Sequence, residues 1–167
     1  MLGYMSTINK EVLNNRFSKI RYLIGNFDVV VYSYMSSIGW VKTGSGSASF
    51  SLENTFITEK VKLLNENSVI TMNNTIGCDL EKDSFRLFAL DIGLGKMDVF
   101  KGAILEGRLT FCSVDSDLKQ KDMYQDVLCY KLMYKQLSEL ENELVVGCSK
   151  DNGKTWFPFL KNYYKRK

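Results

Sequence analysis

The sequence contains no histidine, and this absence excludes more chemistry than any motif in the chain adds. Without an imidazole there is no Ser-His-Asp or Cys-His nucleophile, no histidine-ligated zinc or haem, and no histidine switch near neutral pH. A haem would need Tyr, Met or Cys as its ligand. We therefore expect no cofactor and no metal site.

Proline and long apolar runs are scarce as well. Pro158 is the single proline, which suits long strands, and nowhere do about 18 apolar residues follow one another as in a membrane-spanning helix. Residues 1–15 carry polar side chains throughout and lack the continuous apolar core of a signal peptide. The four cysteines include no Cys-x-x-Cys pair, so we expect reduced, small core residues at Cys78, Cys112, Cys129 and Cys148. A cytoplasmic protein follows from these features.

Neither sign of charge dominates the chain. The net charge of +3 is too small for a nucleic-acid footprint, which needs a clustered basic stripe. The basic tail is interpreted as a solvated end of the chain and consists of Lys161, Lys165, Arg166 and Lys167. A length of 167 residues suits a single domain, 1–167, that buries enough apolar surface to fold without a disulfide or a metal.

The periodicity of apolar residues changes once along the chain. From Ser6 to Ile24 they recur at helical intervals, with Ser6 or Thr7 as the cap, which predicts an amphipathic helix that packs on or plugs the rest. From Gly25 onwards the pattern is that of strands. The glycine- and serine-rich stretch from Met35 to Gly46, which contains Trp40, is predicted to be a long loop.

About ten strands are predicted, separated by turn residues. They span Phe27–Tyr34, Ala48–Leu52, Phe56–Leu64, Ser68–Ile76, Ser84–Asp91, Lys96–Leu105, Arg108–Val114, Val127–Leu137, Glu143–Ser149 and Thr155–Tyr164. Because no helix between them could serve a βαβ crossover, the sheet should be antiparallel. A sheet of this size most simply closes on itself and so removes its edges. The fold class is therefore all-β, a closed up-and-down barrel with an N-terminal helix, wide enough for a cavity.

Three short motifs carry a resemblance to a known group. These are Gly25-Asn26-Phe27 before the first strand, Asp151-Asn152-Gly153-Lys154-Thr155-Trp156 in the last hairpin, and Tyr164-Lys165-Arg166 at the end. Together with the predicted meander, they resemble the calycin superfamily, and within it a bacterial lipocalin-like family of unknown function. Calycins usually have Trp where this chain has Phe27. The resemblance implies that Phe27 and Arg166 replace the tryptophan–arginine lid over one barrel end.

The last hairpin motif also matches a turn of sialidase-type propellers. Ser149 to Trp156 fits the Ser-x-Asp-x-Gly-x-Thr-Trp pattern, but propellers repeat this turn in each blade and here it occurs once. We interpret it as a structural turn in which Asp151 accepts backbone N–H groups, Gly153 supplies an unusual φ and Trp156 packs beneath. Asp151 and Trp156 therefore receive no catalytic role.

Alternation along the strands predicts which side chains face the interior. In Phe56–Leu64 the lysines occupy one face, which leaves Glu59 on the inner face among apolar neighbours. In Val127–Leu137 the same reasoning turns Tyr130 and Tyr134 inward. Strand Ser84–Asp91 is ambiguous, because both of its faces are largely apolar; with one choice Arg86 would meet Glu59.

These residues allow two interpretations each. Glu59 and Arg86 are either a buried or rim ion pair or the polar anchors of a small-molecule site. Tyr130 and Tyr134 either donate hydrogen bonds to a ligand or fill the core. Trp40 either covers the open end or packs on the rim.

The predicted function is the binding of a small hydrophobic molecule inside the barrel, with Glu59, Arg86, Tyr130, Tyr134 and Trp40 as candidate contacts. Two alternatives remain. One is an isomerase or cyclase that uses Glu59 as general base with Tyr130 or Tyr134 as acid, and the other is a protein-interaction module without a small ligand. We expect no nucleic acid and no membrane as partner, and a homodimer is left open.

Overall fold

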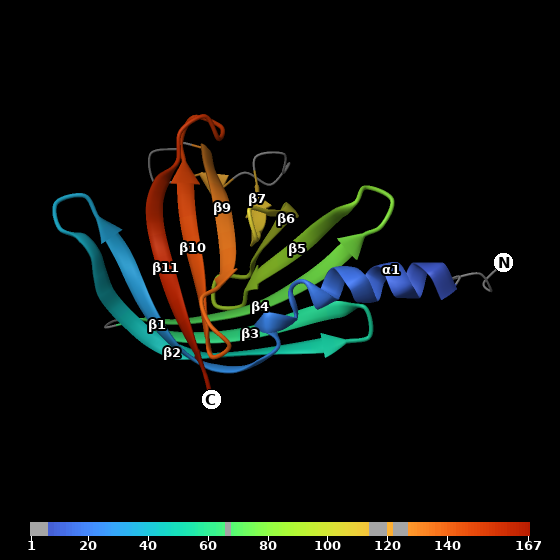
Figure 1. The fold of residues 1–167 in the computed structure, drawn as a ribbon. Helices are drawn as coiled ribbons and strands as arrows, with labels where there is room; N and C mark the ends of the chain where they lie inside the picture. The colour runs from blue at the N-terminus through green and yellow to red at the C-terminus, as the bar shows by residue number, and fades with distance from the viewer. Residues whose placement is uncertain (1–6, 66–67, 114–119, 122–126) are drawn as a thin grey trace.

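A computed structural model of the chain describes residues 7–65, 68–113, 120–121 and 127–167. Figure 1 shows strands wrapped around a common centre, with one helix near the N-terminus. The elements are α1 (Thr7–Ser18), the 3-10 helix η1 (Arg21–Leu23), β1 (Gly25–Met35), β2 (Gly39–Glu53), β3 (Phe56–Asn65), β4 (Ser68–Asp79), β5 (Ser84–Asp91), β6 (Lys96–Leu105), β7 (Arg108–Cys112), β8 (Gln120–Lys121), β9 (Val127–Gln136), β10 (Glu141–Ser149) and β11 (Phe157–Arg166).

The strands form a closed antiparallel barrel. Each of β1 to β6 pairs with the next strand along the chain, β7 pairs with β9, and β11 returns to pair with β1. The pairing of β10 with both β9 and β11 closes the ring, so ten strands of the described chain form it, while the two-residue β8 pairs with β9 alone. This confirms the predicted closed up-and-down barrel with an N-terminal helix.

Two of the predicted elements are wrong in their extent. The helix ends at Ser18, well before Ile24, and a short 3-10 turn replaces its last part; the predicted cap Ser6 lies outside the described residues. The predicted loop from Met35 to Gly46 is a hairpin instead, because β1 runs to Met35 and β2 begins at Gly39. Trp40 therefore lies in a strand and not on a loop.

The glycines of β2 explain why a loop was predicted there. They allow two strands to pack closely and do not make the segment flexible. A Cβ on Gly46 would lie 2.0 Å from the Lys62 carbonyl oxygen, and one on Gly44 would lie 2.2 Å from Oδ1 of Asn65. Both neighbours belong to β3, the strand that pairs with β2. Gly44 and Gly46 thus allow the two strands to approach where a side chain would collide.

One end of the barrel is closed by the motif residues of the calycin resemblance. The Arg166 guanidinium lies 4.9 Å from the centre of the Phe27 ring and donates hydrogen bonds of 2.8 and 3.1 Å to the carbonyls of Ile24 and Tyr22. Gly25 has φ of +146°, and a Cβ there would lie 2.2 Å from Nη1 of Arg166. Only glycine leaves room for this arginine, so the Phe27–Arg166 lid is present as expected.

The N-terminal helix packs against the same end. Phe17, Ile20 and Leu23 are buried in the core, and the Phe17 ring meets Phe85 edge-to-face at 6.4 Å. Figure 1 shows α1 beside the end of the barrel where β4 turns into β5, and an ion pair joins Arg16 to Asp83 of that turn. We refer to this end, with α1, η1 and the Phe27–Arg166 lid, as the closed end.

The opposite end carries the Ser149–Trp156 turn. Asp151 accepts hydrogen bonds from the Thr155 N–H at 2.8 Å and its hydroxyl at 2.5 Å, and Ser149 accepts one from the Gly153 N–H at 2.8 Å. Gly153 has φ of +84°, as the motif requires. These contacts agree with the structural interpretation of the octet.

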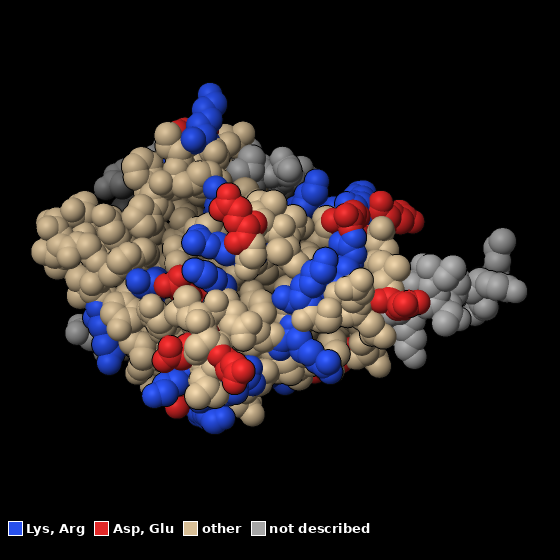
Figure 2. Space-filling model, in the orientation of Figure 1, with Lys and Arg blue, Asp and Glu red and all other residues tan. Residues whose placement is uncertain are grey.

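Charges of both signs are spread over the surface. Figure 2 shows acidic and basic side chains interspersed over one face of the molecule. An extended tan area lies where Figure 1 places the β1–β2 hairpin, whose exposed apolar residues include Tyr34, Met35 and Ile38.

Candidate functional site

A cavity of about 310 Å³ lies inside the barrel. Side chains from β3 to β6 and from β9 to β11 line it, and most of them are apolar, such as Val61, Leu63, Phe100 and Leu132. Asp91, the last residue of β5, also lines it, so the cavity extends toward the end opposite the closed end. Its inner limit is a group of polar side chains, the polar floor, made of Glu59, Asn74, Tyr134, Asn162 and Tyr164.

Glu59 is the centre of the polar floor. Its side chain is 1% exposed, and its carboxylate accepts a 2.7 Å hydrogen bond from the Asn74 amide, which projects from the paired position on β4. The hydroxyls of Tyr134 and Tyr164 lie within 3.3 and 3.4 Å of the same carboxylate. Three neutral donors from three strands therefore surround one acidic group.

Burial dominates the proton affinity of Glu59. Loss of hydration raises its pKa from the ordinary value of 4.5 to about 7, although the hydrogen bonds from Asn74, Tyr134 and Tyr164 act in the opposite direction. The same burial raises the pKa values of Tyr134 and Tyr164 well above their usual range, and the nearby Glu59 charge adds to the rise. At neutral pH the two tyrosines are thus neutral hydrogen-bond donors, while Glu59 is present in both its protonated and its ionised form.

Aromatic packing fixes the two tyrosines in place. The Tyr164 ring meets Phe27 edge-to-face at 6.0 Å and Phe50 at 5.9 Å, so the polar floor rests on the lid residue of the closed end. The Tyr134 ring meets Phe111 at 6.4 Å with an interplanar angle of 90°. The floor is therefore held by rigid strands and rings and not by loops, as a preorganised site requires.

Three of the five predicted contact residues meet in this cavity. Glu59, Tyr130 and Tyr134 all line it, in agreement with the inward faces predicted for β3 and β9. Tyr134 reaches Glu59 directly. Tyr130 lies nearer the start of β9, on the wall between the floor and the end opposite the closed end.

Arg86 and Trp40 are not among the described residues of the cavity wall. The inward set of β5 is Phe85, Leu87 and Ala89, all of which are buried, so Arg86 lies on the outer face. Its guanidinium is 3.8 Å from Asp79 of the neighbouring strand, and the contact with Glu59 that one register allowed is not made.

Trp40 packs on the outside of the barrel. Its ring meets Tyr34 at 5.2 Å, and the Lys161 ammonium lies 4.8 Å from its centre. These contacts correspond to the rim interpretation and leave the lid interpretation without support, because the loop on which the lid depended is a strand.

Asn74, Asn162 and Tyr164 belong to the site but were not predicted from the sequence. The signal for Asn74 was present, since Ile70, Met72 and Ile76 occupy the same face of β4. On β11 the alternation of lysines with Asn162 and Tyr164 carried similar information. The lysine criterion that identified Glu59 would have found Asn162 and Tyr164, whereas β4 contains no lysine and its apolar face was the signal for Asn74.

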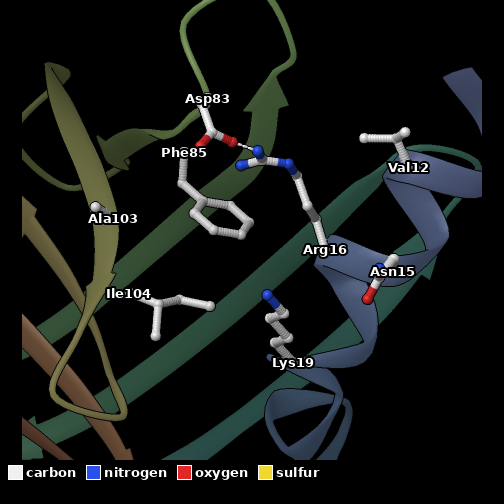
Figure 3. A pocket seen from close by; sticks show the side chains of 8 residues that line it. All are labelled: Val12, Asn15, Arg16, Lys19, Asp83, Phe85, Ala103 and Ile104. Atoms are coloured by element: carbon white, nitrogen blue, oxygen red, sulfur yellow. Dashed lines mark ion pairs between the residues drawn. The ribbon is translucent and has the colours of Figure 1, made fainter.

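A second hollow, of about 380 Å³, lies on the surface between α1 and the barrel. Figure 3 shows Arg16 of α1 and Lys19, just after the helix, reaching toward β5 and β6, with the ion pair between Arg16 and Asp83 across the hollow. Charged side chains form part of its wall, whereas the barrel cavity, itself partly open, is lined mostly by apolar side chains with a few convergent polar groups. The latter composition is that of small-molecule sites.

In the part of the chain that the structure describes, no cluster of His, Cys, Asp and Glu side chains could hold a metal ion. No helix there is long and apolar enough to cross a bilayer. All four cysteines are free thiols, as predicted; Cys129 is fully buried, but Cys78, Cys112 and Cys148 are half-buried, so the predicted core position is correct for Cys129 alone.

The sequence matches no model of a known protein family and no curated protein. Solved structures do share the fold. Rv2717c from M. tuberculosis aligns with a TM-score of 0.62 at 10% identity, over 90% of this chain and 96% of that protein. The S-type phycobiliprotein lyase CPES from Guillardia theta aligns with a TM-score of 0.63 at 8% identity, over 94% of this chain and 96% of the lyase. At these identities the likeness concerns the barrel fold alone.

Proposed function

We propose that this protein binds a small, largely apolar molecule in the barrel cavity, with Glu59 as its main polar contact. The observation that carries the proposal is a partly open cavity of about 310 Å³ inside the barrel, with mostly apolar walls and a polar floor. Ligand sites range from roughly 300 to 1,000 Å³, so this cavity suits a ligand at the small end. A fold shared with a phycobiliprotein lyase agrees with a ligand-handling role. Membership of the bacterial lipocalin-like family and a cytoplasmic location are part of the same proposal.

The test is to fill the cavity from its wall. Ala89 is buried, lines the cavity and pairs with Asn74 of the polar floor. Ala89→Phe adds a ring to the cavity, whereas Leu90→Phe changes the exposed neighbour on the outer face of the same strand. Both variants and the wild type would be exposed to a cell extract, re-purified and examined by native mass spectrometry.

We expect the wild type and Leu90→Phe to carry the same small molecule and Ala89→Phe to lack it. Leu132→Phe, on β9 of the cavity wall, provides a second blocked variant if Ala89→Phe unfolds. A wild type that carries no small molecule, or a blocked variant that carries as much as the wild type, contradicts the proposal. The first result would favour a protein-interaction module.

A barrel enzyme is the second candidate, and the specific observation in its favour is the pKa of Glu59. A carboxylate with a pKa of about 7 in an apolar cavity meets the requirement for a general base at neutral pH. Tyr134 would be a weak acid partner, because burial raises its pKa well above the usual value. If turnover of a bound molecule is found, Glu59→Gln should abolish it while leaving binding of a neutral ligand largely intact.

A further inference from the structure

The polar floor contains acceptors that nothing in the described structure satisfies. Asn74 is 7% exposed and Asn162 is 5% exposed, and Oδ1 of each lacks a hydrogen-bond partner. The orientation of Asn74 has a clear cause: the Glu59 carboxylate needs a donor, so the Asn74 nitrogen faces it and the oxygen is left over. Buried polar atoms are nearly always paired, so two unpaired ones in one cavity point to a missing donor.

The charged groups of the cavity are all acidic among its described lining residues. These are Glu59 in the floor, Asp98 on β6 and Asp91 at the end of β5, and the described lining includes no Lys or Arg. Asp91 also accepts a 3.0 Å hydrogen bond from the Leu94 N–H and so shapes its own turn. A negatively charged ligand would therefore meet charges of its own sign, with no cation on the described wall to receive it.

We propose that the ligand is a lipophilic amine: an apolar body fills the cavity, and a protonated nitrogen contacts Glu59 and the free carbonyl oxygens of Asn74 and Asn162. This inference rests on the proposed function and gives its ligand a chemical class. An ammonium group has three donors and no acceptor, which complements a site that offers acceptors. A hydroxyl head group supplies one donor only, and a carboxylate supplies none.

The pH dependence of amine binding near pH 7 should come mainly from Glu59, because its neighbours in the floor are neutral there. Asn74 from β4, Tyr134 from β9 and Tyr164 from β11 are neutral near pH 7, and Asp91 and Asp98 are the other acidic groups of the described lining. A bound ammonium favours the carboxylate form of Glu59. Amine binding near pH 7 should therefore release protons, roughly half a proton per ligand when Glu59 is half protonated beforehand.

The experiment compares three probes with the same ten-carbon chain: decylamine, decan-1-ol and decanoate. Isothermal titration calorimetry at pH 8, below the aggregation threshold of each probe, gives the affinities of the wild type. Repeating the decylamine titration at pH 7 in buffers of different ionisation enthalpy gives the number of protons released. Glu59→Gln removes the charge at constant shape, and Glu139→Gln, an exposed residue between β9 and β10, is the matched control.

We expect decylamine to bind about tenfold or more tightly than decan-1-ol, and decanoate to bind most weakly, as a charge-assisted hydrogen bond predicts. Glu59→Gln should remove the amine preference and the proton release while decan-1-ol affinity stays within about threefold. Glu139→Gln should behave as the wild type. The ordering of the three probes on the wild type needs no variant, so it decides the matter even if Glu59→Gln fails to fold.

Two other outcomes overturn the inference in distinguishable ways. If decan-1-ol binds as tightly as decylamine, or if Glu59→Gln keeps the amine preference, the amine class is wrong while the binding function stands. If none of the three probes binds and the cell extract yields no ligand either, the proposed function itself fails.

Discussion

Glu59 and Asp151 are two carboxylates that each accept several hydrogen bonds, yet their surroundings move their pKa values in opposite directions. Asp151 lies in the solvent-facing turn, where bonds from Thr155 and Ser149 hold its pKa well below the usual range. Glu59 accepts a similar set of bonds inside the barrel, and burial still raises its pKa to about 7. Hydration, and not the number of hydrogen bonds, separates the two.

The comparison also separates structure from function. The Asp151 turn is the most conspicuous motif of the sequence and uses its carboxylate to hold its own backbone. Glu59 belongs to no motif, but it lines the barrel cavity beside unsatisfied acceptors. An ionisable group whose proton affinity is strongly shifted in a cavity is a candidate for function, whereas a turn that satisfies its own groups is not.

The largest expected effect is on the pH dependence of stability. The folded pKa of Glu59, about 7, exceeds its ordinary value of 4.5, so the folded state binds more protons than the unfolded state between these pH values. The free energy of unfolding should therefore fall as pH rises from about 4.5 to 7, by roughly 3 kcal/mol, and then level off. Urea unfolding at pH 5 and pH 8 measures this difference.

Glu59→Gln is the matched variant for that measurement. The free energy of unfolding of this variant should change less between pH 5 and pH 8 than that of the wild type. The variant should also be more stable than the wild type at pH 8, because no charge remains to be buried. The amide of Asn74 can turn to accept a hydrogen bond from the new side chain. Equal slopes for wild type and variant would show that Glu59 does not titrate in this range.

A smaller effect is expected from Tyr134→Phe. The change keeps the ring that packs on Phe111 but removes a donor that lowers the pKa of Glu59. The pKa of Glu59 should rise further, so the upper bend of the stability curve should move above pH 7, with a change of about 1 kcal/mol at pH 8. Tyr163→Phe is the matched control, because this tyrosine lies on the outer face of β11 and its ring packs on Tyr32; it should leave the bend where it is.

The smallest effect is expected from Asp151→Asn, and it falls in a different pH range. A carboxylate with a lowered pKa stabilises the fold above its ordinary value near 3.8, and this stabilisation is lost as pH falls below it. Wild type should lose stability between pH 5 and pH 2.5 more steeply than Asp151→Asn, while both bind decylamine equally. A change in ligand affinity in this variant would mean that the turn takes part in the site.

The candidate site residues differ in how well their orientation could be predicted from the sequence. The lysines on one face of β3 were enough to predict that Glu59 faces inward. The lysines on one face of β9 gave the same prediction for Tyr130 and Tyr134. Arg86 could not be placed, because β5 has apolar residues on both faces and only the closed ring decides which set is inside. A pattern of period two locates a face but not the neighbour across the barrel.

The prediction of a loop in place of the β1–β2 hairpin was wrong for a different reason. Glycines at 44 and 46 are typical of loops, but here they permit close pairing with β3, a contact between strands that local propensity does not contain. Likewise, the meeting of Asn74, Tyr134 and Tyr164 at Glu59 depends on strands far apart in the chain. Local alternation predicted that Glu59 and Tyr134 face inward, and only the closure of the barrel brings them together with Asn74 and Tyr164.

The most direct test of this account is the titration of the Glu59 carboxyl group by carbon-13 NMR, assigned by its loss in Glu59→Gln. We expect a midpoint near pH 7 in the free protein and a downward shift when decylamine is bound. A midpoint near the ordinary value of 4.5, unchanged by the amine, would show a hydrated floor and contradict the account.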